Sequence, residues 1–134
     1  MSTDAAAGAP LVPGYAGHAD VLARRLSDQQ VRAWVGEMLA ELEERIPIDA
    51  VRDRFEEVLL HCEFGNQHVI KAIEDNRFAE PDKVQLVEDV DRRLIEVANR
   101  GRTIEPEGLS GLLDDLDRAF NERSAAIEAQ LKRS

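Results

Sequence analysis

Cysteine is nearly absent from this sequence. Cys62 is the single cysteine, so the chain cannot form an internal disulfide. A lone free thiol is typical of proteins that work in a reducing compartment. The opening residues MSTDAAAGAPLVPG also lack the basic region and the apolar core of a secretory signal. We therefore expect a cytoplasmic location.

Long hydrophobic runs and excess positive charge are missing as well. The apolar runs are only a few residues long, whereas a membrane helix needs about 20 residues. The chain has 17 Lys and Arg against 27 Asp and Glu, which gives a net charge of −10. Such a charge repels phosphate backbones and anionic lipid surfaces. These observations argue against nucleic acid and membranes as partners.

The usual signatures of catalysis are missing too. Gly108 and Gly111 do not form a phosphate-binding loop, because no Gly-Lys-Ser/Thr sequence follows them. The sequence contains neither a serine nucleophile elbow nor the cysteine and histidine spacing of a zinc site. Cys62 falls among apolar positions, where a thiol acts as a small hydrophobic side chain. We expect no cofactor.

What the sequence does contain is helical periodicity. The 134 residues are 43% hydrophobic, enough for one folded domain. Apolar residues recur at steps of three and four, and no segment alternates as a half-buried strand does. The sequence therefore predicts an all-α fold, an antiparallel helical bundle of four main helices with a short N-terminal helix. The expected helices span residues 18–26, 28–46, 50–75, 82–99 and 106–132, and Gly65-Asn66 either kinks or breaks the third of them.

The boundary between the first two helices is placed at Ser27. Gln30 stands at the capping-box position three residues later, so Ser27 is predicted to cap the second helix. Ahead of the helices, residues 1–16 have no apolar period and are predicted to form a flexible arm whose end Tyr15 anchors. Residues 17–134 then form the helical bundle domain.

The last helix has an apolar stripe that extends beyond its neighbour. At 1.5 Å per residue it is about 13 Å longer than the helix before it, so one end overhangs. Apolar residues that their own chain leaves uncovered usually find another chain, which predicts a homodimer. The alternative is that a curved bundle or the arm covers the stripe. The predicted self-association face consists of Leu113, Leu116, Phe120, Ile127 and Leu131.

Three residues carry the chemistry of a possible metal or acid/base site. Glu57, His61 and His68 fall on one side of the third helix if that helix is continuous. Glu57 and His61 have Glu-x-x-x-His spacing, however, whereas metal sites in bundles use Glu-x-x-His. The two histidines lie about 10 Å apart along the axis, too far to share one ion. The alternative is an ordinary Glu–His pair on a solvated face.

Two acidic groups lack the loop spacing of a calcium site and are predicted to form solvated helix faces. They are Asp114, Asp115 and Asp117, and Glu88, Asp89 and Asp91.

These observations favour a non-catalytic acidic interaction protein, a dimerising regulatory, chaperone-like or accessory subunit that docks on a partner protein. One alternative is a metal-dependent helical enzyme that uses the Glu57 and His61 pair. The other is a small-ligand binder with a pocket between the helices, lined by Trp34, Met38, Phe55 and Val87.

Overall fold

The structure, a computed structural model, describes residues 12–18, 21–64, 71 and 81–132. These residues form α-helices and short 3₁₀ turns without a strand, so the predicted all-α class is confirmed. The α-helices are α2 (Val21–Arg45), α3 (Arg52–Phe64), α5 (Pro81–Arg100) and α6 (Leu109–Lys132), and the turns are η1 (Asp49–Val51) and η2 (Pro106–Gly108).

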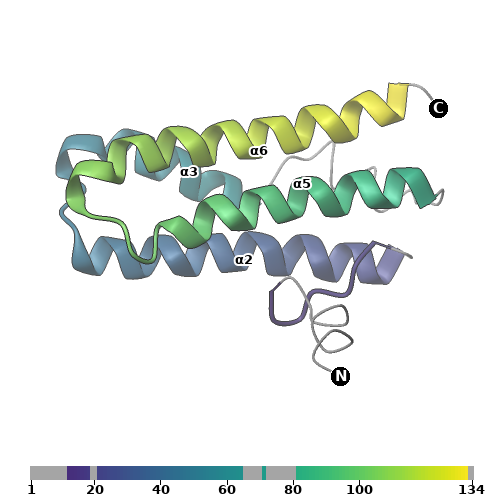
Figure 1. Cartoon of the computed structure of the whole chain (residues 1–134), viewed down its shortest axis with the longest axis horizontal. Coiled ribbons are helices and arrows are strands. Elements are labelled where there is room, and N and C mark those ends of the chain that lie inside the picture. Colours follow the sequence, from purple (N-terminus) through teal and green to yellow (C-terminus); the bar gives the residue numbers. More distant parts are fainter. Residues whose placement is uncertain (1–11, 19–20, 65–70, 72–80, 133–134) are drawn as a thin grey trace.

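The four helices pack as two hairpins laid side by side (Figure 1). Within the hairpins, α2 packs against α3 and α5 packs against α6, and each pair is antiparallel. Between the hairpins, α2 packs against α5 and α3 against α6. The colours of Figure 1 show that α2 and α5 run in the same direction. The predicted antiparallel arrangement therefore describes the hairpins, while the neighbours between hairpins are parallel.

Proline and glycine mark the helix ends as predicted. Pro81 begins α5, Pro106 opens the turn before α6, and α2 ends two residues before Pro47. Gly101 follows the last residue of α5, but its φ angle is not positive. A Cβ atom on Gly101 would overlap the sulfur of Met38, so a larger residue there requires the Met38 side chain to move.

The predicted break at Ser27 is wrong. α2 runs without interruption from Val21 to Arg45, so the expected short helix over 18–26 is the beginning of this longer helix. Ser27 is buried inside α2, and its hydroxyl bonds to the segment that precedes the helix instead of capping one. The capping-box pattern around Ser27 therefore serves a tertiary contact.

Some predictions fall on residues outside the description. Gly65-Asn66 and His68 lie there, so the continuity of the helix expected over 50–75 stays a prediction beyond Phe64. Residues 1–11 of the predicted arm also lie outside it, whereas Val12 is buried in the core. No helix in the described ranges has the length and apolar character to cross a membrane.

Candidate functional site

The most unusual feature of the core is a buried ion network formed by Asp28, Asp91, Arg123 and His18. Arg123 of α6 donates from Nε to Asp91 of α5 at 2.7 Å and from a terminal nitrogen to Asp28 of α2 at 2.7 Å. His18 Nε2 lies 2.6 Å from the other oxygen of Asp91. All four side chains are buried. The network therefore ties three helices together in the core.

Each carboxylate of the network is paired with arginine. Asp91 is paired with Arg123, and Asp28 with Arg123 and Arg32, whose Nε donates to the second oxygen of Asp28 at 3.0 Å. Burying a charge is costly unless it is paired and hydrogen-bonded, and both carboxylates meet this condition.

The charged residues occupy positions on the apolar stripes of their helices. Asp91 lies four residues after Val87 and four before Ile95, and both of these are buried. Arg123 lies three residues after Phe120 and four before Ile127. The prediction that Asp91 belongs to a solvated face is therefore wrong. The missed signal was a set of opposite charges at core positions of three different helices.

Residues 12–18, which we call the strap, close the network from outside the helices. The strap begins with a turn in which the Tyr15 N–H donates to the Val12 carbonyl at 3.0 Å. Pro13 and Gly14 occupy the middle of the turn, and Gly14 has a φ angle of 83°. This is the sequence and geometry of a type II turn, which needs glycine at its third position.

Side chains of α2 and α5 hold the strap. Ser27 accepts from the Ala16 N–H at 2.9 Å and donates to the Gly17 carbonyl at 2.8 Å. Glu88 accepts from the His18 N–H at 3.1 Å. Asp91 accepts from the Tyr15 hydroxyl at 3.0 Å as well as from His18. We call Ser27, Glu88 and Asp91 the strap seat. The predicted anchoring by Tyr15 is confirmed.

The contact between His18 and Asp91 determines which ring nitrogen of His18 carries a hydrogen. A carboxylate only accepts hydrogen bonds, so Nε2 must carry the hydrogen that points at Asp91. Within the described part of the chain, the buried Nδ1 atom of His18 has no hydrogen-bond partner. The ring edge packs against Tyr15, with 5.7 Å between the ring centroids. This ring nitrogen is therefore left unsatisfied by the described residues.

The environment shifts the pKa of several of these groups. Burial opposes ionisation of Asp91, but the charge of Arg123 and the hydrogen bond from His18 outweigh it, so the pKa of Asp91 lies below its usual value. Burial and the neighbouring Asp91 carboxylate both raise the pKa of Tyr15. Burial opposes the charge on Arg123, yet the two carboxylates raise its pKa. Asp91 and Arg123 are therefore charged, and Tyr15 is neutral, at physiological pH.

The predicted Glu57, His61 and His68 site is not assembled by the described residues. Glu57 is exposed, and His68 lies outside the description. The ring of His61 stacks on Phe120 of α6 at 4.8 Å between centroids, and its Nε2 lies 3.4 Å from Asp117. His61 thus lies between α3 and α6 with a partly exposed side chain. Among the described residues, no three His, Cys, Asp or Glu side chains are placed to hold a metal ion.

The predicted self-association face is buried within the single chain. Leu113, Leu116, Phe120 and Ile127 are core residues, and the side chain of Leu131 lies outside the description. The reason for expecting a dimer through this face, apolar surface left uncovered on the last helix, does not hold for these four residues. Whether the chain self-associates by another surface is a separate question.

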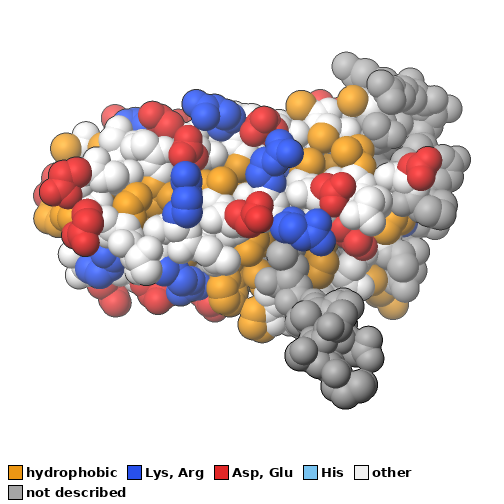
Figure 2. Space-filling model, viewed as in Figure 1, with side chains coloured by type: hydrophobic (Ala, Val, Ile, Leu, Met, Phe, Trp, Pro, Cys, Tyr) orange, Lys and Arg blue, Asp and Glu red, His pale blue; other side chains and the backbone are white. Residues whose placement is uncertain are grey.

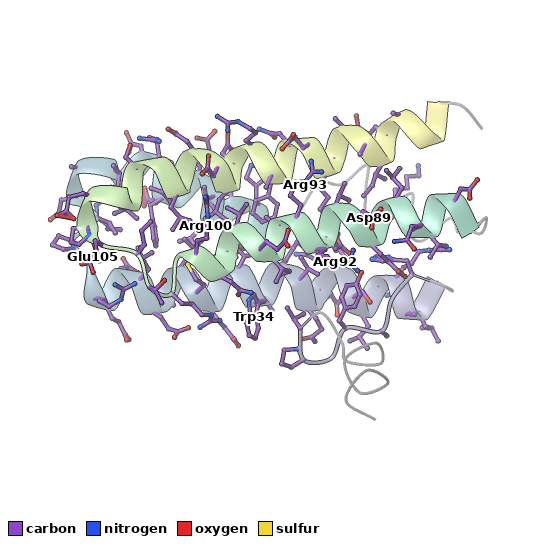
Figure 3. All side chains as sticks on the ribbon, viewed as in Figure 1. Trp34, Asp89, Arg92, Arg93, Arg100 and Glu105 are labelled. Atoms are coloured by element: carbon purple, nitrogen blue, oxygen red, sulfur yellow. The ribbon has the colours of Figure 1, made fainter. Side chains whose placement is uncertain are left out.

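The apolar residues expected around a ligand pocket also belong mainly to the core. Met38, Phe55 and Val87 are fully buried. Trp34 of α2, labelled in Figure 3, is partly buried and packs against the core. Its indole N–H donates to Asn99 at 2.8 Å, and the guanidinium of Arg102 lies 4.5 Å from the ring centroid. Such a cation–π contact stabilises an aromatic ring at the surface.

The remaining candidate side chains have structural roles. Asp114 and Asp115 pair with Arg54 of α3 and Arg100 of α5, so this acidic group links helices while staying partly exposed. Cys62 is buried against the core, and burial raises the pKa of its thiol to about 12. A thiol with such a pKa is almost entirely protonated at neutral pH and is a poor nucleophile.

Three large apolar side chains stand out at the surface. Leu22 and Leu26 of α2 are 75% and 42% exposed, and Leu60 of α3 is 54% exposed. In the view of Figure 2, acidic and basic side chains alternate over the surface with apolar side chains between them. Figure 3 labels part of this surface along α5, where Asp89, Arg92 and Arg93 lie within one helical turn. The pair on α2 is notable because its members are one turn apart.

Comparison with family models, with curated proteins and with solved structures finds no match to this chain. The functional argument therefore depends on the residues themselves.

Proposed function

We propose that this chain is a non-catalytic helical interaction protein that pairs with a second copy of itself and acts as an accessory subunit for a partner protein. The observation that carries the proposal is the pair of exposed leucines on α2, Leu22 and Leu26. Monomeric proteins usually scatter their exposed apolar residues singly, and contiguous apolar surface marks interaction sites.

The leucine pair suits a second copy because it is self-complementary. In a two-fold dimer the same patch meets itself, so Leu22 of one copy packs beside Leu26 of the other where two α2 helices cross in antiparallel directions. Residues one turn apart on a helix form such a ridge. The predicted dimer is thereby retained, but on α2 in place of the buried face of α6.

The use of the polar side chains supports a binding role over catalysis. Three buried polar groups with shifted pKa values, Tyr15, Asp91 and Arg123, bond to one another inside the chain. Such a network specifies how the helices pack.

The experiment is a measurement of molar mass in solution by light scattering over a wide range of protein concentrations. We expect a dimer for the unchanged chain and a monomer for the double variant Leu22→Glu with Leu26→Glu. Leu60→Glu is the matched control, because it adds the same charge at a comparably exposed leucine of another helix and should leave the dimer intact. A wild-type monomer at every concentration, or a dimer that survives the double variant, would disprove the proposal.

A further inference from the structure

The strap is bound to the helices in the way that a peptide is bound to a protein. Its backbone makes no regular secondary structure, and its polar groups bond to the side chains of the strap seat. Four hydrogen bonds run from the strap to the seat, from the Tyr15 hydroxyl, the Ala16 and His18 N–H groups and the His18 ring. One runs back from Ser27 to the Gly17 carbonyl. The seat thus recognises a segment rich in donors.

We propose that the strap seat is a binding site for an extended peptide segment of a partner protein, and that residues 12–18 occupy it as an internal competitor. The strap itself shows which chemistry fits. An aliphatic side chain enters the core at Val12, a tyrosine three residues later reaches Asp91, and a histidine three residues after that reaches the same carboxylate. This proposal does not depend on the dimer.

The strap turns at two glycines. Gly14 and Gly17 have φ angles of 83° and 75°, a region that glycine adopts without strain, so a partner segment that follows the same path needs glycine at these two positions. The buried Nδ1 atom of His18 has no partner among the described residues, which weakens the hold on the strap. A competing segment that buries no such unpartnered polar atom is expected to bind the seat more tightly than the strap does.

The tethering of the strap sets the strength of the competition. A segment joined to its own binding site by a short linker is present at a high effective concentration, so it blocks weak competitors. A partner peptide therefore enters only when it binds more tightly or when the hold on the strap is reduced. The strap therefore sets the minimum affinity that a partner peptide needs in order to occupy the seat.

The test uses a fluorescein-labelled synthetic peptide with the sequence of residues 12–18, Val-Pro-Gly-Tyr-Ala-Gly-His, titrated with the full-length chain and followed by fluorescence anisotropy. His18→Ala weakens the internal competitor but leaves the seat intact. We expect the peptide to bind this variant about tenfold more tightly than the unchanged chain, as expected when one charge-assisted hydrogen bond is lost from the strap. Tyr15→Phe, which removes a single hydroxyl, should raise the affinity in the same direction.

Two controls locate the binding. Ser27→Ala added to His18→Ala removes both hydrogen bonds from α2 and should weaken peptide binding about tenfold. A peptide with phenylalanine and alanine in place of tyrosine and histidine should not bind. Circular dichroism checks that each variant is folded, and Tyr15→Phe carries the test if His18→Ala is not. The proposal is overturned if the folded variants do not bind the peptide, if they bind it no better than the unchanged chain, or if Ser27→Ala has no effect.

Discussion

The Nε2 atom of His18 lies 2.6 Å from a carboxylate oxygen of Asp91, although 73 residues of sequence separate the two. Asp91 in turn bonds to Arg123, which reaches Asp28. The strap and three helices therefore share one connected set of buried hydrogen bonds. Removing one member leaves its buried partners with fewer hydrogen bonds, which makes the network sensitive to single substitutions.

Arg123→Ala should be strongly destabilising. It removes the cation shared by Asp28 and Asp91 and leaves both carboxylates buried. Breaking a buried ion pair in this way costs about 3–5 kcal/mol of unfolding free energy, which urea denaturation measures. Arg118→Ala is the control on the same helix, because the pair of Arg118 with Asp115 is at the surface. The urea midpoint of this variant should therefore hardly change. Equal effects of the two variants would contradict the importance of the network.

Protonation of Asp91 should account for part of the loss of folding stability at acid pH. Its folded pKa is lower than its unfolded pKa, so its contribution is complete above the unfolded value of about 4 and is lost as the pH falls through the folded value. Urea midpoints measured between about pH 5 and pH 2 should fall less steeply in Asp91→Asn than in the unchanged chain. Asp89→Asn, on the exposed side of α5, is the control. An acid dependence that Asp91→Asn leaves as steep as before would show that the effect arises elsewhere.

Tyr15 is the only tyrosine, so phenolate absorbance reports on the strap alone. Burial raises the pKa of Tyr15 above its unfolded value, so the neutral phenol is favoured in the folded chain. The stability it contributes is complete below about pH 10 and is lost as the pH rises through the folded pKa. In an alkaline titration we expect the phenolate signal to lag behind that of free tyrosine and to appear together with the loss of helix by circular dichroism. A phenolate that forms near pH 10 while the helices persist would show that the strap opens on its own.

Alanine substitutions at two glycines should change the stability of the chain in opposite directions. Gly101→Ala places a methyl group against the sulfur of Met38 and beside the Leu112 side chain and the Ala98 carbonyl, and should cost about 1–3 kcal/mol because these packed groups must move to make room. Gly111→Ala in α6 meets no atom within 4 Å and should stabilise the chain by up to about 1 kcal/mol through helix propensity. Thermal unfolding of the two variants measures both. If both substitutions change the unfolding temperature in the same direction, the contact between residue 101 and the Met38 side chain does not limit stability.

The helices could be predicted from the sequence because their signals are local. Pro81, Pro106 and Pro47 restrict the backbone wherever they occur, and a three-to-four repeat of apolar residues needs no knowledge of the partner helix. These signals placed most ends of the four described helices within three residues, but they wrongly divided α2 at Ser27, and the end expected at residue 75 lies beyond the described part of α3.

The site could not be predicted in the same way. A charged residue on an apolar stripe interrupts the pattern that identifies core positions, as Arg123 does between Phe120 and Ile127. Asp28 and Arg123 are 95 residues apart, and nothing in the local pattern relates them. The helix boundary predicted at Ser27 was wrong because a serine hydroxyl that can cap a helix can equally bind a neighbouring segment. Tertiary contacts decide between these two roles.

The large sequence separation within the network also orders events during synthesis. A ribosome makes the strap and Asp28 before α5 and α6, so the bonds from His18 to Asp91 and from Arg123 to Asp28 form only after those helices have left the exit tunnel. Helical hairpins with local contacts, such as α5 with α6, form quickly, whereas closure across 95 residues is slow. The early part of the nascent chain therefore waits with its charges solvated, and the docking of the strap marks the completion of the fold.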